Sequence, residues 1–157
     1  MTVSYLGLGS NLGDKKKHLE LAVKKLASVD GIEIIEKSTF YVTKPVDGPV
    51  QGDYLNGVVK IKTTISPGCL IGTLKNIESE MGRCSCPRNY PRIIDIDILF
   101  YGNAIINTET LIIPHPRMHK RYFVLKGLVE IAPDEVHPVY KKTVSEIYEN
   151  MLAGCFE

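Results

Sequence analysis

The chain has 157 residues, of which 44% are hydrophobic and 24% are charged, the ordinary balance of a globular protein with a sizeable core. Its formal net charge of +1 argues against the strongly basic surface that is typical of nucleic-acid-binding proteins. No basic region precedes an apolar run at the start, and no apolar stretch is long enough to span a bilayer, so we expect a cytoplasmic protein without a membrane partner.

Periodicity and turn residues divide the first half of the chain into four elements. The loop between the last two carries two prolines and two glycines, which exclude regular structure there. Asp14 is a good N-cap for the helix. In chain order, the predicted elements are a strand at 2–10, a helix at 14–29, a strand at 31–43 and a strand at 54–64.

The second half begins with a helix that opens with Ser-Pro and closes with Gly82. A short basic loop and an apolar strand follow it. Two prolines, Pro114 and Pro116, keep the next segment irregular before it becomes helical. The predicted elements are a helix at 66–82, a strand at 91–100, a helix ending before Pro133 and a helix at 141–151.

The element order β-α-β-β-α-β, followed by helices, is the split βαβ pattern of a ferredoxin-like fold. We therefore predict an α+β protein with an antiparallel sheet, with helices on one face and the C-terminal helices on the other. A single domain over residues 1–157 is expected.

Two carboxylates interrupt the apolar strand "PRIIDIDILF". Asp95 and Asp97 lie two residues apart, so they project from the same face of the strand, where they repel unless a cation lies between them. A magnesium ion suits such a pair. The alternative, of equal weight from these residues alone, is that each aspartate caps a turn or pairs with an arginine such as Arg92.

A row of basic residues occupies "HPRMHKR". In an extended backbone His115, Arg117, His119 and Arg121 would project to one side, which suits a polyphosphate. Alone, this stretch reads more readily as a solvated loop. Beside a strand with paired carboxylates, it indicates phosphoryl transfer instead.

Arginines bracket the loop before the aspartate strand, at Arg83, Arg88 and Arg92. Such side chains could close over a phosphate, and the alternative is an ordinary charged surface loop. Two cysteines of this loop, Cys84 and Cys86, form a C-x-C without a second ligand pair at zinc spacing, so we expect reduced thiols.

The glycines in "GLGSNLGD" resemble a phosphate-binding loop, but their spacing fits neither the Walker nor the dinucleotide motif. A strand-to-helix turn is the favoured interpretation. Tyr54 and Phe123 are core residues by default, whereas Asn56 at the start of a strand could hydrogen-bond the edge of a heterocycle.

These motifs together resemble the 6-hydroxymethyl-7,8-dihydropterin pyrophosphokinase family of the folate pathway. The similarity extends over nearly the whole chain. It is carried by "YLGLGSNLGD", "FYVTKP", "DYLNGVV", "PRIIDIDIL" and "IPHPRMHKRYFVLKGLVEIAP". The resemblance implies a three-layer α-β-α sandwich on a ferredoxin-like core. It also implies Mg²⁺-dependent transfer of pyrophosphate from ATP to the pterin hydroxymethyl group, releasing AMP, with two Mg²⁺ ions bound with ATP.

The resemblance also assigns roles to residues of this sequence. Asp95 and Asp97 match the two magnesium ligands, and Arg83 and Arg92 match the arginines that stabilise the transferring group. ATP-contacting positions correspond to Glu78, Arg92, Ile98, His115 and Arg121. Pterin-binding positions correspond to Thr43, Val46, Tyr54, Asn56 and Phe123, with Tyr54 and Phe123 as the two rings that sandwich the pterin.

The loop 83–92 departs from the family pattern. Some members have a second arginine just past Arg83, where this sequence has Cys84 and Ser85, and Asn89 and Tyr90 replace a common Trp-Gly. Tyr90 is therefore a hypothetical substitute for the aromatic lid. Two rival functions, a non-catalytic nucleotide- or metal-sensing domain and an RNA-binding module, use the same fold, but neither explains the aspartates, basic row and aromatics together. We expect a monomer with ATP and the pterin as partners, no nucleic acid, and no fused folate-pathway domain.

Overall fold

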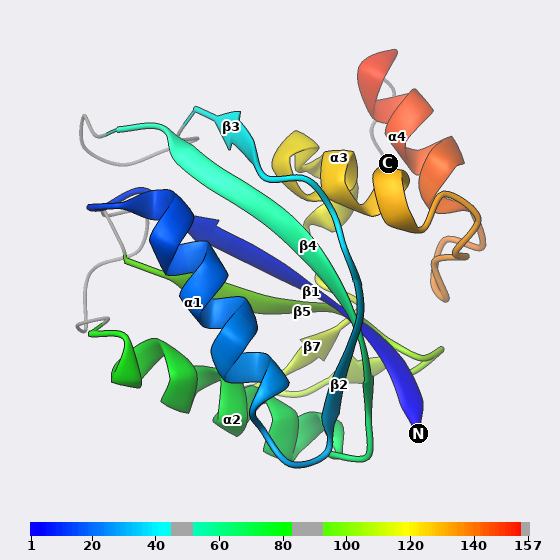
Figure 1. Ribbon diagram of the computed structural model, residues 1–157. Coiled ribbons are helices and arrows are strands. Elements are labelled where there is room, and N and C mark those ends of the chain that lie inside the picture. The colour runs from blue at the N-terminus through cyan, green and yellow to red at the C-terminus, as the bar shows by residue number, and fades with distance from the viewer. Residues whose placement is uncertain (45–51, 83–92, 155–157) are drawn as a thin grey trace.

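The computed structural model describes residues 1–44, 52–82 and 93–154, and a twisted antiparallel sheet lies at its centre (Figure 1). The strand order is β2-β4-β1-β5, and β3 also pairs with β4. A separate hairpin joins β6 and β7. The strands are β1 (Thr2–Ser10), β2 (Ile32–Lys37), β3 (Tyr41–Thr43), β4 (Tyr54–Thr63), β5 (Asp95–Tyr101), β6 (Ile106–Asn107) and β7 (Ile112–Ile113).

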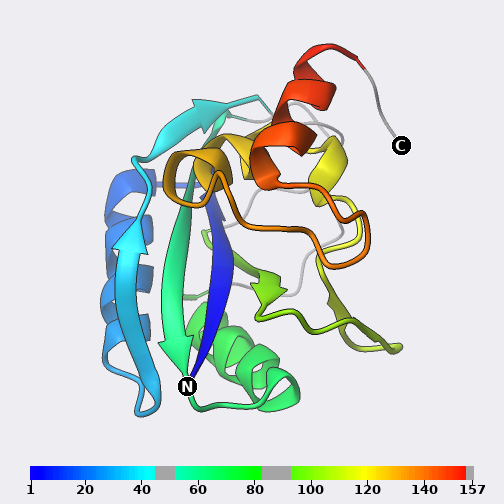
Figure 2. The ribbon, with the colours of Figure 1, turned by 90° about the vertical axis from the view of Figure 1, so that its right-hand side faces the viewer.

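Helices cover both faces of the sheet, as Figures 1 and 2 show. One face carries α1 (Lys15–Ala27) and α2 (Pro67–Glu80), and the other carries α3 (Tyr122–Ile131) and α4 (Val144–Leu152). The predicted layers are therefore confirmed. Among the described residues, every helix is too short or too polar to cross a bilayer.

Alternation along the strands gives each face of the sheet its own core. Leu6 and Leu8 of β1 pack toward α1 and α2, whereas Tyr5 packs toward α3 and α4. The same alternation in β5 sends Ile96 and Ile98 into the first core and Leu99 into the second. Asp95 and Asp97 therefore share the α3 side of the sheet with Leu99, as predicted.

The single strand predicted at residues 31–43 is wrong, because the segment forms two strands, β2 and β3. Between them, the hydroxyl of Ser38 accepts the N–H of Val58 at 2.9 Å, and the ring of Phe40 lies over Gly57. A Cβ on Gly57 would stand 2.8 Å from that ring. The Ser38 hydroxyl thus accepts the N–H of Val58 in place of a main-chain carbonyl. The chain can therefore leave the sheet after β2 and pair again, as β3, near the start of β4.

Side chains cap the first turns of α1 and α4. Asp14 accepts the N–H of Lys17 at the start of α1, as predicted. At α4, Thr143 and Glu146 form a reciprocal capping box. The start of α4 is therefore fixed at Thr143 by two side-chain hydrogen bonds.

Candidate active site

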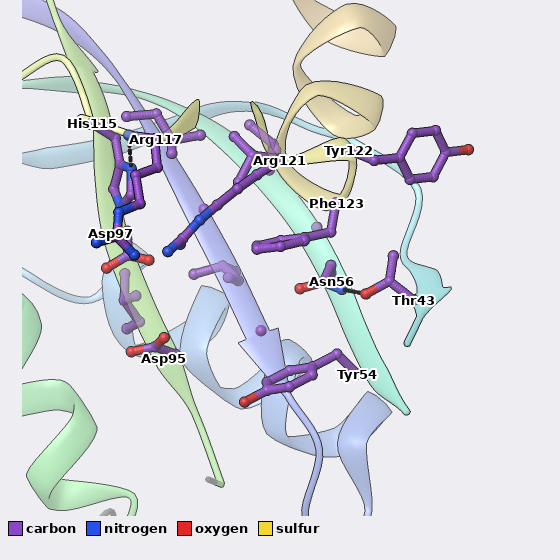
Figure 3. A pocket seen from close by; sticks show the side chains of 18 of the residues that line it. Thr43, Tyr54, Asn56, Asp95, Asp97, His115, Arg117, Arg121, Tyr122 and Phe123 are labelled. Atoms are coloured by element: carbon purple, nitrogen blue, oxygen red, sulfur yellow. Dashed lines mark hydrogen bonds between the residues drawn. The ribbon is translucent and has the colours of Figure 1, made fainter. Parts of the chain in front are cut away.

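A cavity of about 1110 Å³ opens at the edge of the sheet where β1 ends and β4 and β5 begin. Its lining comes from β1, β3, β4, β5, α2 and the segment that leads into α3. Figure 3 shows two groups of side chains in it, with carboxylates and basic residues at one end and aromatic and amide groups at the other.

Two glycines of β1 form the floor between these groups. Gly7 is paired with Asp97 and Gly9 with Asp95 across one ladder, and across the other ladder Gly9 is paired with Asn56. A Cβ on Gly9 would stand 3.0 Å from the Asn56 Oδ1 atom. These two glycines lie inside the strand predicted at 2–10, and they leave space that side chains would fill. Only Gly13, with φ +71°, lies in the turn before α1.

The two aspartates are half-buried and both line the cavity. Glu78 of α2 contacts the strand between them, because its Oε2 atom accepts the main-chain N–H of Ile96 at 2.8 Å. Glu78 is only 5% exposed, so its carboxylate anchors the strand as well as lining the cavity. Hard oxygen donors on one strand face, beside open space, are a donor set that suits Mg²⁺.

The basic row does not have the extended backbone in which all four side chains would project to one side. The main-chain N–H of His115 donates to the Leu99 carbonyl at 3.1 Å, which fixes the start of the row against β5. A 3₁₀ turn, η1 (Met118–Lys120), follows and rotates His119 away from the cavity onto the ring of Tyr140, with ring centroids 4.9 Å apart. The other three residues line the cavity, and Figure 3 shows His115 and Arg121 extending toward Asp97.

The opposite end of the cavity is lined by two rings with an amide between them (Figure 3). Tyr54 and Phe123 are the rings, and Asn56, which is 5% exposed, donates its amide N–H to the Thr43 hydroxyl. That contact orients the amide so that its oxygen faces Gly9. The Arg121 guanidinium carbon lies 5.4 Å from the centroid of the Phe123 ring and thus connects the two ends.

Nine of the predicted site residues line the cavity, and one that the structure describes does not. Ile98 has a side chain in the core beneath α1 and α2 and does not line the cavity. Val46, Arg83 and Arg92, like Tyr90, lie outside the described residues. The nine that line the cavity are Thr43, Tyr54, Asn56, Glu78, Asp95, Asp97, His115, Arg121 and Phe123.

Further cationic side chains line the cavity that no sequence pattern singled out. Lys75 is on the same face of α2 as Glu78, one turn earlier, a spacing that could have revealed it. Among the described lining residues, the carboxylates of Glu78, Asp95 and Asp97 are outnumbered by cations. The cations are Lys44, Lys75, Arg117, Lys120 and Arg121. This excess of positive charge suits an anionic ligand.

Comparison with known proteins adds an independent line of information. The family described as 7,8-dihydro-6-hydroxymethylpterin-pyrophosphokinase (HPPK) matches residues 5–133. A 2-amino-4-hydroxy-6-hydroxymethyldihydropteridine pyrophosphokinase of Aquifex aeolicus is 42% identical over 97% of this chain and 94% of its own. The folic acid synthesis protein fol1 of Pneumocystis carinii is 43% identical over 94% of this chain. This chain spans only 20% of the length of that protein.

Solved structures of HPPK-DHPS proteins have the same fold. One, in complex with substrates, has a TM-score of 0.76 at 17% identity and covers 98% of this chain and 44% of its own. The wild-type Plasmodium falciparum protein has a TM-score of 0.74 at 18% identity and covers 97% of this chain and 45% of its own. The predicted ferredoxin-like α+β architecture is thereby confirmed.

Proposed function

Because the chain belongs to the 7,8-dihydro-6-hydroxymethylpterin-pyrophosphokinase family, we propose that it transfers pyrophosphate from ATP to the hydroxymethyl group of 6-hydroxymethyl-7,8-dihydropterin. The products are the pterin diphosphate and AMP, in a step of folate biosynthesis. One observation carries this proposal. A single cavity joins a strand with paired carboxylates to a pocket formed by two rings and an amide.

The aromatic end is proposed to bind the pterin. A flat heterocycle stacks well between Tyr54 and Phe123, and the edge of the ring would meet Asn56. The Thr43 hydroxyl supports this role because it holds the amide in one orientation. Val46 remains a predicted part of this pocket from the resemblance alone.

The charged end is proposed to bind the triphosphate of ATP. Asp95 and Asp97 would hold Mg²⁺, for which we propose two ions, and the metal supplies charge neutralisation of the phosphates. His115 and Arg121 extend toward this end and would contact phosphate oxygens. Arg83, Arg92 and Ile98 remain predictions for the same end.

Catalysis on this proposal depends on positioning. The pterin hydroxymethyl oxygen attacks the β-phosphorus of ATP in line. The bond from that phosphorus to the oxygen that bridges it to the α-phosphorus breaks, AMP leaves with its electrons, and the hydroxyl proton is released to water. The residues of the cavity hold the two substrates with their reacting atoms adjacent and surround the transferred group with positive charge. A dedicated general base is not required among the lining residues for such a transfer.

Product analysis tests the proposed reaction. The protein is incubated with ATP, Mg²⁺ and 6-hydroxymethyl-7,8-dihydropterin, and the nucleotides are separated by ion-exchange chromatography. We expect AMP that appears only when the pterin is present. ADP would identify a simple kinase, and ATP binding without turnover would favour the rival sensing domain.

Replacing Asn56 with leucine is expected to weaken binding of 6-hydroxymethylpterin by about 10- to 100-fold, because polar groups of the bound pterin lose their partner in a buried site. The Kd is measured by isothermal titration calorimetry. Asn107→Leu is the matched control, since Asn107 is exposed on β6 away from the cavity. Equal pterin affinity in Asn56→Leu and the wild type would contradict the assignment of this pocket.

A further inference from the structure

One tyrosine side chain reaches from the sheet into the first turns of α3. Tyr41 of β3 is 7% exposed, and its hydroxyl donates to the carbonyl oxygen of Phe123. The same hydroxyl accepts the N–H of Gly127 at 3.1 Å. Residues 123 and 127 stand four apart, so these are the two groups that an α-helix pairs with each other. The Tyr41 hydroxyl therefore contacts both the carbonyl acceptor and the N–H donor that would pair in the first turns of α3.

Glycine at position 127 makes this contact possible. A Cβ there would stand 2.6 Å from the Val58 Cγ2 atom and 2.8 Å from the Tyr41 hydroxyl. Any other residue would push α3 away from β4 and out of reach of the hydroxyl. Glycine is a poor helix former, so its presence inside α3 has a packing reason.

The helix turn that Tyr41 holds is the one that carries Phe123. The Phe123 ring lines the cavity, and the Arg121 guanidinium lies over it. Tyr41 itself does not line the cavity, and its hydroxyl reaches the lining through the main chain of Phe123. Its strand is paired so that Tyr41 faces Asn56 and Thr43 faces Tyr54 in the register. Tyr41 thus links α3, which carries Phe123, to the paired strands β3 and β4, which carry the other residues of this end of the cavity.

We propose that Tyr41 is a positioning residue that sets the height of the Phe123 ring above Asn56, and so the width of the slot that accepts a flat heterocycle. This inference rests on the proposed pterin-binding function. Burial raises the pKa of the Tyr41 hydroxyl well above its usual range, so the hydroxyl keeps its proton and remains a donor under all physiological conditions.

The test uses Tyr41→Phe, which removes the hydroxyl and keeps the ring. Tyr101→Phe is the matched control, because the Tyr101 hydroxyl also donates to a main-chain carbonyl, that of Ile65, at 2.5 Å, and Tyr101 does not line the cavity. Calorimetry gives the Kd of 6-hydroxymethylpterin in the presence of a non-hydrolysable ATP analogue, and the Kd of the analogue alone. Thermal unfolding gives the loss of stability in each variant.

We expect Tyr41→Phe to weaken pterin binding about 3- to 10-fold and the ATP analogue less than about twofold, the size of effect that one lost hydrogen bond produces. Tyr101→Phe should lose comparable stability with both affinities unchanged. Gly127→Ala, which displaces α3 from the hydroxyl, should weaken pterin binding in the same selective way.

The results that overturn the inference differ from those that overturn the proposed function. Wild-type protein that binds pterin, together with Tyr41→Phe that binds it equally well, overturns the role of Tyr41 alone. So does an equal loss of both affinities in Tyr41→Phe, which would indicate general destabilisation. Wild-type protein that binds ATP and no pterin overturns the proposed function and this inference with it.

Discussion

Replacing Asp97 with asparagine is expected to lower kcat by at least about a thousandfold, because the proposed reaction concentrates the negative charge of a triphosphate at this carboxylate pair. Asp97 lies on the cavity side of β5, across the ladder from Gly7, with His115 and Arg121 extending toward it. Asparagine keeps the size and the strand geometry and removes only the charge that is proposed to hold the metal. Asp95→Asn should have an effect of the same order.

The measurement is pterin-dependent AMP formation at saturating ATP over a range of Mg²⁺ concentrations. Asp134→Asn is the matched control, since Asp134 is exposed in the loop after α3 and should leave kcat unchanged. Thermal unfolding of both variants shows whether a loss of kcat is accompanied by a loss of stability. An Asp97→Asn enzyme within about tenfold of wild-type kcat would contradict a metal-binding role for this strand.

Acidification is expected to destabilise the protein through His137, by about 2 kcal/mol between pH 7.5 and pH 5. His137 is 3% exposed, and its Nδ1 atom accepts the N–H groups of Val139 at 3.2 Å and Tyr140 at 3.1 Å. A protonated Nδ1 cannot accept either bond. Burial, with a smaller contribution from His119, lowers the pKa of His137 from its ordinary 6.5 to about 4.

The direction follows from the two protonation states. The unfolded chain takes up the proton as pH falls through 6.5, whereas the folded protein resists it until about pH 4. The contribution of His137 to the free energy of unfolding is therefore fully present above pH 6.5, and it is lost as the pH falls from 6.5 to about 4. Urea unfolding at both pH values measures the effect, and His137→Gln should reduce the difference by about 2 kcal/mol. A difference that His137→Gln does not reduce would refute the assignment.

Sequence patterns were sufficient wherever a short-range rule decides the structure. The two-residue period of a strand placed Asp95 and Asp97 on one face, and side-chain capping placed the start of α1 at Asp14. The alternation of strands and helices predicted the layers, because each element has to bury an apolar face. The resemblance, read from sequence alone, pointed to nine residues that line the cavity.

The tertiary structure alone decided features that depend on contacts between distant residues. The basic row bends into a 3₁₀ turn because His115 is fixed to Leu99 and His119 packs on Tyr140, neither of which its own spacing reveals. Gly7 and Gly9 become a cavity floor only because β5 and β4 flank them. Tyr41 meets Phe123 and Gly127 only because α3 packs against the sheet. Local preferences act over a few residues, whereas a site is made where long-range packing brings elements together.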